Sequence, residues 1–129
     1  MHTTEITKEN FDETVGEGIV FLDWWASWCG PCRAFAPIYE RAAARHTDAT
    51  WGKVDTEAQP ELAQAFGITA IPTLMVFRDG ILLFEQPGMV PALTLDKLVE
   101  RVRELDMDEI RQKLAEEKAK GEQPTATTA

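Results

Sequence analysis

Apolar residues recur along this chain with two periods, every second position in some segments and every third or fourth in others. The first spacing predicts strands and the second predicts helices. Strands and helices therefore take turns along the sequence, without internal repeats. The expected strands cover residues 3–6, 19–25, 50–55, 73–77 and 81–85, and the expected helices cover residues 11–15, 32–46, 60–66 and 95–105.

Particular residues refine this order. The segment 19–25 is apolar almost throughout, which is typical of a central strand covered on both faces. Asp79 and Gly80 between two apolar runs predict a hairpin. Thr7 and Thr94 offer side-chain oxygens before the first and the last of these helices, so we expect both to act as caps. Pro37 is expected to kink the helix over 32–46.

The composition changes after residue 105. Residues 106–120 are dense in charge, and residues 121–129 are polar and rich in Thr. We predict one domain over residues 1–105, followed by an extension over residues 106–129 that forms a marginal helix and a disordered tail.

Net charge bears on partners and compartment. The chain has 22 acidic and 13 basic residues, a formal net charge of -9, which repels nucleic-acid phosphates and anionic lipid surfaces. No charged-then-apolar leader opens the sequence, and no apolar run approaches the ~18 residues of a membrane span. We therefore expect a cytoplasmic protein in a reducing compartment, with neither nucleic acid nor membrane as its partner.

The two cysteines, Cys29 and Cys32, are the only ones in the chain. A bridge between them closes a loop too short to stabilise the fold much, so chemistry is the better explanation for them. If a strand ends near Trp25 and a helix begins near Cys29, the dipole of that helix favours a thiolate on Cys29, the expected nucleophile.

The spacing of the pair suits disulfide exchange. Residues three apart in a helical turn have Cα atoms roughly 5 Å apart, a separation that a disulfide accepts. Cys32 is therefore expected to resolve the mixed disulfide that Cys29 forms, leaving a Cys29–Cys32 bond. Pro31 fits the first turn of the helix, where its missing N–H costs nothing.

A cysteine pair with this spacing is also found in proteins with functions other than disulfide exchange. The same spacing is half of a zinc site, but only His2 and His46 remain as soft ligands, so we expect no metal. An inert buried pair is disfavoured by its place at a strand-to-helix turn. An iron–sulfur ligand pair shared between two chains, or a binding module acting through residues 106–120, stays open.

A set of residues in matching order and spacing resembles the thioredoxin family. These are residues 25–32 (Trp-Ala-Ser-Trp-Cys-Gly-Pro-Cys), Asp23, Pro37, residues 71–73 (Ile-Pro-Thr) and Gly88. The resemblance covers roughly residues 3–105 and implies the α/β thioredoxin fold, a central mixed sheet with helices on both faces. It also implies a protein-disulfide reductase without a bound cofactor, acting on client proteins with disulfides and recycled by a thioredoxin reductase.

Residue roles follow from the same resemblance. Asp23 corresponds to a buried carboxylate that moves the proton of Cys32, and its apolar neighbours predict burial and a raised pKa. Lys53 corresponds to a lysine near that carboxylate and is a possible modulator. Trp25 is expected to pack under the active-site turn. The expected substrate-binding residues are Trp28, Gly30, Pro31, Ile71, Pro72 (with a cis peptide bond) and Gly88.

Three residues depart from the family pattern. Trp24 stands where phenylalanine is usual, and Arg33 stands where lysine is common. Pro87 precedes Gly88 in the last expected strand, where it removes a backbone donor and is tolerated only at a sheet edge. The Gly-Pro pair between the cysteines favours a reductant, because oxidants and isomerases of this fold tend to carry a histidine there.

Overall fold

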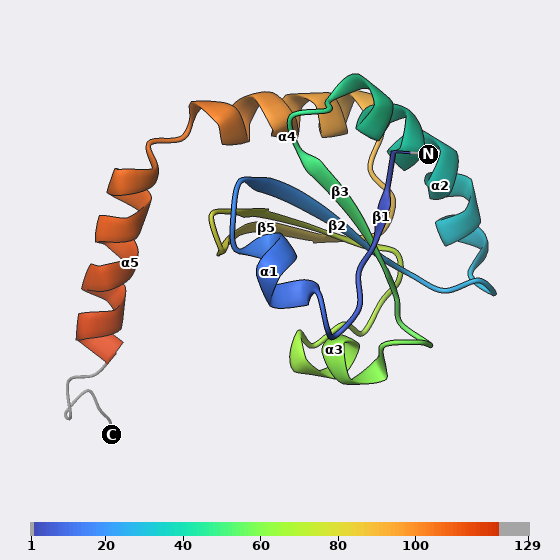
Figure 1. The fold of residues 1–129 in the computed structure, drawn as a ribbon, viewed down its shortest axis with the longest axis horizontal. Helices are drawn as coiled ribbons and strands as arrows, with labels where there is room; N and C mark the ends of the chain where they lie inside the picture. Colours follow the sequence, from blue (N-terminus) through green and yellow to red (C-terminus); the bar gives the residue numbers. More distant parts are fainter. Residues whose placement is uncertain (1, 122–129) are drawn as a thin grey trace.

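The structure is a computed structural model that describes residues 2–121, and it contains one five-stranded sheet with helices on both faces (Figure 1). In chain order the elements are β1 (Thr4–Glu5), α1 (Phe11–Val15), β2 (Ile19–Trp25), α2 (Gly30–Arg45), β3 (Thr50–Asp55), α3 (Pro60–Ala65), β4 (Thr73–Arg78), β5 (Ile81–Pro87), α4 (Ala92–Glu104) and α5 (Met107–Gly121). The expected alternation of strands and helices is confirmed.

The sheet is mixed, with the strand order β1-β3-β2-β4-β5. β1, β3 and β2 are parallel, whereas β4 is antiparallel to β2 and β5 is antiparallel to β4. β2 is therefore the middle strand, as its apolar run predicts. In this register Asp23 of β2 lies directly between Lys53 of β3 and Leu74 of β4.

Two apolar layers sandwich the sheet. The layer under α2 and α4 consists mainly of Phe21, Phe35, Tyr39, Trp51, Leu74, Val76, Leu95 and Val99. The layer under α1 and α3 consists mainly of Ile6, Phe11, Val15, Val20, Leu22, Trp24, Val54, Met75 and Phe77. Because side chains alternate along a strand, Asp23 points to the same layer as Phe21, the one that α2 covers.

Both predicted helix caps are wrong. Asn10, not Thr7, precedes α1, and its Oδ1 accepts a hydrogen bond from the Thr7 amide instead of capping the helix. α4 begins at Ala92, so Thr94 lies inside it. The cause is Pro91, whose fixed φ suits a helix start and whose carbonyl accepts the Thr94 amide at 3.0 Å.

α5 follows α4 and extends away from the sheet (Figure 1). Met107 is buried at its start, but from Arg111 to Lys120 its residues are exposed. Arg78 holds the junction, because its Nη1 donates to the Val102 carbonyl at 2.7 Å and to the Leu105 carbonyl at 3.3 Å. The predicted disordered tail lies outside the described residues from 122 onward. Within residues 2–121, no helix combines the length and the apolar character that a membrane crossing requires.

Candidate active site

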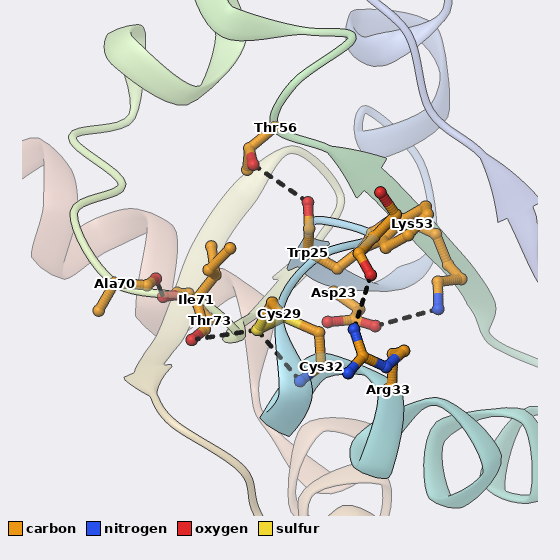
Figure 2. The surroundings of a disulfide bond; sticks show 11 residues. Asp23, Trp25, Cys29, Cys32, Arg33, Lys53, Thr56, Ala70, Ile71 and Thr73 are labelled. Carbon is orange, nitrogen blue, oxygen red and sulfur yellow. Dashed lines mark hydrogen bonds and ion pairs between the residues drawn. A yellow bond between two sulfur atoms is a disulfide. The ribbon is translucent and has the colours of Figure 1, made fainter.

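The cysteine pair lies where β2 gives way to α2 (Figure 2). Cys29 is the N-cap residue of α2, and Pro31 occupies the first turn of the helix. The Cα atoms of Cys29 and Cys32 are 5.2 Å apart, and a disulfide joins the two residues. The predicted strand-to-helix turn therefore presents the pair at the positive end of a 16-residue helix.

Backbone groups surround the Cys29 sulfur. The Cys32 amide donates a hydrogen bond to Cys29 Sγ at 3.2 Å. The carbonyl oxygen of Ile71 lies 3.8 Å from the same sulfur, on its other side in Figure 2. An amide that already points at this sulfur stabilises negative charge on it when the disulfide is opened.

A second chain segment closes over the disulfide. The side chains of Trp25 and Ile71 pack against the buried cluster formed by Ala26, Cys29 and Cys32, and Trp25 was expected to pack under this turn. The Ile71–Pro72 peptide bond is cis, as the resemblance implies. The Gly88 amide donates to the Pro72 carbonyl at 2.7 Å, and Gly88 has a φ of 89°, a conformation that favours glycine. The fold thus places Ile71 beside Cys29, and the hydrogen bond to Pro72 ties Gly88 to the same segment.

Trp28 differs from the other tryptophans near the site. Its side chain is 65% exposed, whereas Trp24 is fully buried and Trp25 is half-buried. Gly30 and Pro31 are also exposed beside the disulfide. Tryptophan is enriched at protein–protein interfaces, so the exposed Trp28 ring is a candidate contact for a partner protein.

Asp23 is fully buried in the layer under α2. Lys53 Nζ lies 3.4 Å from Asp23 Oδ2 (Figure 2), and neither carboxylate oxygen accepts an aligned hydrogen bond from the described residues. Burial raises the pKa of Asp23 from its usual 3.8 to about 6, against the opposing charge of Lys53. The predicted burial and the direction of the pKa are both confirmed.

The structure explains how Pro87 and Arg33, two of the residues that depart from the family pattern, are accommodated. Pro87 ends β5, an edge strand, where a missing donor is tolerated. Arg33 donates from Nη1 to the Ser27 carbonyl at 2.9 Å and so ties the active-site turn together. Within residues 2–121 the side chains of His, Cys, Asp and Glu form no group of three or more that could hold a metal ion.

Sequence reasoning missed three side chains near the site. Thr56 Oγ1 donates to the Trp25 carbonyl at 3.1 Å, and Thr73 Oγ1 donates to the Ala70 carbonyl at 2.6 Å (Figure 2). Tyr39 lies in the buried layer, and Lys53 Nζ is 6.0 Å from the centroid of its ring. Only Tyr39 had a signal in the sequence, because it lies seven positions after Cys32 on the same face of one helix.

Comparisons with known proteins agree with this geometry. The family model of thioredoxin matches residues 2–104. A Streptomyces coelicolor relative, whose name contains the word thioredoxin, is 55% identical over 91% of this chain and 88% of its own length. A thioredoxin of Chlamydia muridarum is 35% identical over 74% of this chain and 94% of its own length. A solved mutant thioredoxin from Halobacterium salinarum is 32% identical, with a TM-score of 0.75 over 81% of this chain and 94% of that one.

The chain belongs to the thioredoxin family. It is a thiol-disulfide oxidoreductase with protein-disulfide reductase activity, and its redox centre is the Cys29–Cys32 disulfide rather than a bound cofactor. The match to the Streptomyces coelicolor relative covers more of the chain than residues 2–104, so it reaches into the extension.

Proposed function

We propose that this thioredoxin reduces client disulfides through Cys29 as nucleophile and Cys32 as resolving thiol. The Cys29 thiolate attacks one sulfur of a client disulfide, which forms a mixed disulfide and releases the other client sulfur as a thiolate. The Cys32 thiolate then attacks Cys29 Sγ and releases the second client sulfur. The client gains two electrons, and the Cys29–Cys32 disulfide is formed.

The observation that carries this order of attack is the position of Cys29 at the N-cap of α2. Its sulfur already accepts the Cys32 amide, so the charge of a thiolate has a donor and a helix dipole at hand. Cys32 lies inside the first turn and lacks such a position. The thiolate is the attacking form, so Cys29 reacts first.

Asp23 is proposed to take the proton of Cys32 when Cys32 becomes the nucleophile. Its side chain points to the face that α2 covers, and α2 carries Cys32. A carboxyl with a pKa of about 6 exchanges protons near neutral pH. Lys53 modulates this exchange, because its ammonium favours the ionised form of Asp23.

The docking surface for client proteins is proposed to surround the disulfide. It comprises Trp28, Gly30, Pro31, Ile71, Pro72 and Gly88. The exposure of Trp28 supports an apolar contact with the client. The hydrogen bond from the Gly88 amide to the Pro72 carbonyl, next to the Ile71 carbonyl that lies beside Cys29, supports a fixed backbone edge beside the disulfide.

The family also supports a partner and a compartment. A thioredoxin reductase is the proposed electron donor, proteins with disulfides are the proposed clients, and the cytoplasm is the proposed compartment. Residues 1–105 are the proposed thioredoxin domain, and residues 106–129 are the proposed charged C-terminal extension.

Insulin reduction tests the assignment. Wild-type protein, Cys29→Ser and Cys32→Ser are compared, first with dithiothreitol and then with a thioredoxin reductase and NADPH as reductant. We expect both variants to lose turnover and only Cys32→Ser to accumulate a mixed disulfide with the client. Mixed disulfides on Cys29→Ser instead would reverse the order of attack. Client binding and biological activity that survive Cys29→Ser would favour the binding module.

A further inference from the structure

Lys53 approaches three side chains from two elements. Its Nζ lies 3.4 Å from Asp23 Oδ2, 5.0 Å from the centroid of the Trp25 ring and 6.0 Å from the centroid of the Tyr39 ring. A cation within about 6 Å of an aromatic face is attracted to it. The ammonium therefore has two aromatic contacts as well as one carboxylate.

The aromatic contacts help to hold the Lys53 ammonium in place, because the Lys53 side chain is partly exposed to solvent. Its side chain is 22% exposed, whereas Asp23 is fully buried. A flexible lysine with access to solvent regains hydration and rotamer freedom when it swings outward. One ion pair at 3.4 Å without an aligned hydrogen bond is a weak restraint against that movement.

The Tyr39 ring is itself held in one orientation. Its hydroxyl donates to the Gly52 carbonyl at 2.7 Å, one residue before Lys53 on β3. Its ring meets the Trp51 ring edge to face, with centroids 5.2 Å apart and an interplanar angle of 77°. Burial, and then the charge of Asp23, raise the pKa of Tyr39, so the hydroxyl stays protonated and keeps this bond.

We propose that Tyr39 is a positioning residue for disulfide exchange: its ring, together with that of Trp25, holds the Lys53 ammonium against Asp23 and thereby sets the proton affinity of Asp23. This inference rests on the proposed role of Asp23 in proton transfer. Trp25 packs against the cluster of Ala26, Cys29 and Cys32, and its ring also lies beneath the Lys53 ammonium, so it lies between the cysteine site and the lysine site.

Among residues 2–121, few titratable groups lie around Asp23, so the influence of Tyr39 on its pKa can be separated from the direct influence of Lys53. Lys53 reaches it from β3 and is the cation that opposes its burial. Tyr39 lies on α2, and its hydroxyl stays neutral because burial and then the charge of Asp23 raise its pKa. In the oxidised protein Cys29 and Cys32 form the disulfide and do not titrate. A change at Tyr39 that acts through Lys53 must therefore disappear when Lys53 is removed.

The test is a carbon-13 NMR titration of the Asp23 carboxyl in oxidised protein. Tyr39→Leu removes the ring and is expected to raise the pKa of Asp23 by roughly half a unit to one unit, because the cation is released. Tyr39→Phe keeps the ring without its hydroxyl and is expected to leave the pKa close to the wild-type value. In the Lys53→Met background, Tyr39→Leu is expected to have no such effect.

Two outcomes would overturn the proposal. One is a Tyr39→Leu shift of equal size with and without Lys53, and the other is the absence of any shift. A second measurement needs no variant: the Lys53 Cε protons should resonate upfield of a free lysine, because the Nζ atom bonded to Cε lies over the Trp25 and Tyr39 rings. Unshifted protons would contradict the proposal even if Tyr39→Leu does not fold. Neither readout requires turnover, so the insulin assay tests the exchange reaction separately.

Discussion

Replacing Asp23 by asparagine is expected to stabilise the folded protein above pH 6. The carboxyl group is fully buried, and neither oxygen accepts an aligned hydrogen bond within residues 2–121. An unfolded chain ionises this group near its ordinary pKa of 3.8, whereas the folded chain does so at about 6. Between these two values the folded state binds the proton more tightly, so stability falls as the pH rises.

The size of the effect follows from the two pKa values. One pKa unit corresponds to 1.36 kcal/mol, so the interval from 3.8 to about 6 corresponds to roughly 3 kcal/mol. Asparagine has nearly the same shape and never ionises. The free energy of unfolding of Asp23→Asn should therefore match that of the wild type below pH 4 and exceed it by about 3 kcal/mol at pH 8.

Urea unfolding of the oxidised proteins at several pH values between 3 and 8 measures this difference. The other carboxylates are common to both proteins and cancel in the comparison. Asp12→Asn makes the same chemical change on the exposed side of α1, and it should alter stability at pH 8 by no more than about 1 kcal/mol. A gain in stability for Asp23→Asn that is independent of pH, or no gain at pH 8, would contradict the reasoning that ionisation of the buried Asp23 carboxyl lowers folding stability by about 3 kcal/mol.

Three further substitutions test other parts of the structure. Trp28→Ala should raise the KM for insulin roughly tenfold with little change in urea stability, because the ring is exposed outside the core and belongs to the proposed docking surface for the client. Gly52→Ala should destabilise the fold by about 1–3 kcal/mol in urea unfolding, because the new Cβ would lie 2.6 Å from a buried isoleucine carbon. Arg78→Met should cost about 1–3 kcal/mol and speed amide exchange at the start of α5, since it leaves carbonyls at the end of α4 without their donor. An unchanged KM would contradict the expectation for Trp28→Ala, and an unchanged urea midpoint would contradict that for Gly52→Ala. Unchanged amide hydrogen exchange would contradict the expectation for Arg78→Met.

Local patterns predicted the site well where the chemistry depends on neighbours in sequence. The spacing of Cys29 and Cys32 at a strand-to-helix turn was sufficient to predict their disulfide and its place at a helix N-terminus. The apolar run around Asp23 predicted its burial for the same reason. The predicted caps failed because α1 begins after Asn10, whose side chain bonds back to the Thr7 amide, and because Pro91 sets the start of α4.

The pairing of strands lies beyond such patterns. Lys53 faces Asp23 because β3 runs parallel to β2 in one particular register, and a shift by one residue would turn its side chain to the opposite face. Thirty residues separate the two positions, and from sequence alone only the family resemblance linked them. Tyr39 shares a face of α2 with Cys32 by its spacing, but its approach to Lys53 depends on how α2 lies across the sheet.

The same strand register places the Asp23 carboxyl, which destabilises the fold when ionised, in the middle of the sheet. Asp23 is two residues before the end of β2, so its carboxyl lies under the helix that begins at the cysteines. A surface carboxylate with an ordinary pKa would be a poor acceptor for a thiol proton near pH 7, because its proton affinity is too low. Burial raises that affinity, and Lys53 limits the rise to about 6, so the group is still ionised at neutral pH. In the proposed role of Asp23 as acceptor of the Cys32 proton, the loss of roughly 3 kcal/mol in stability accompanies the tuning of this carboxyl for exchange, and Asp23→Asn should gain stability while slowing the attack by Cys32.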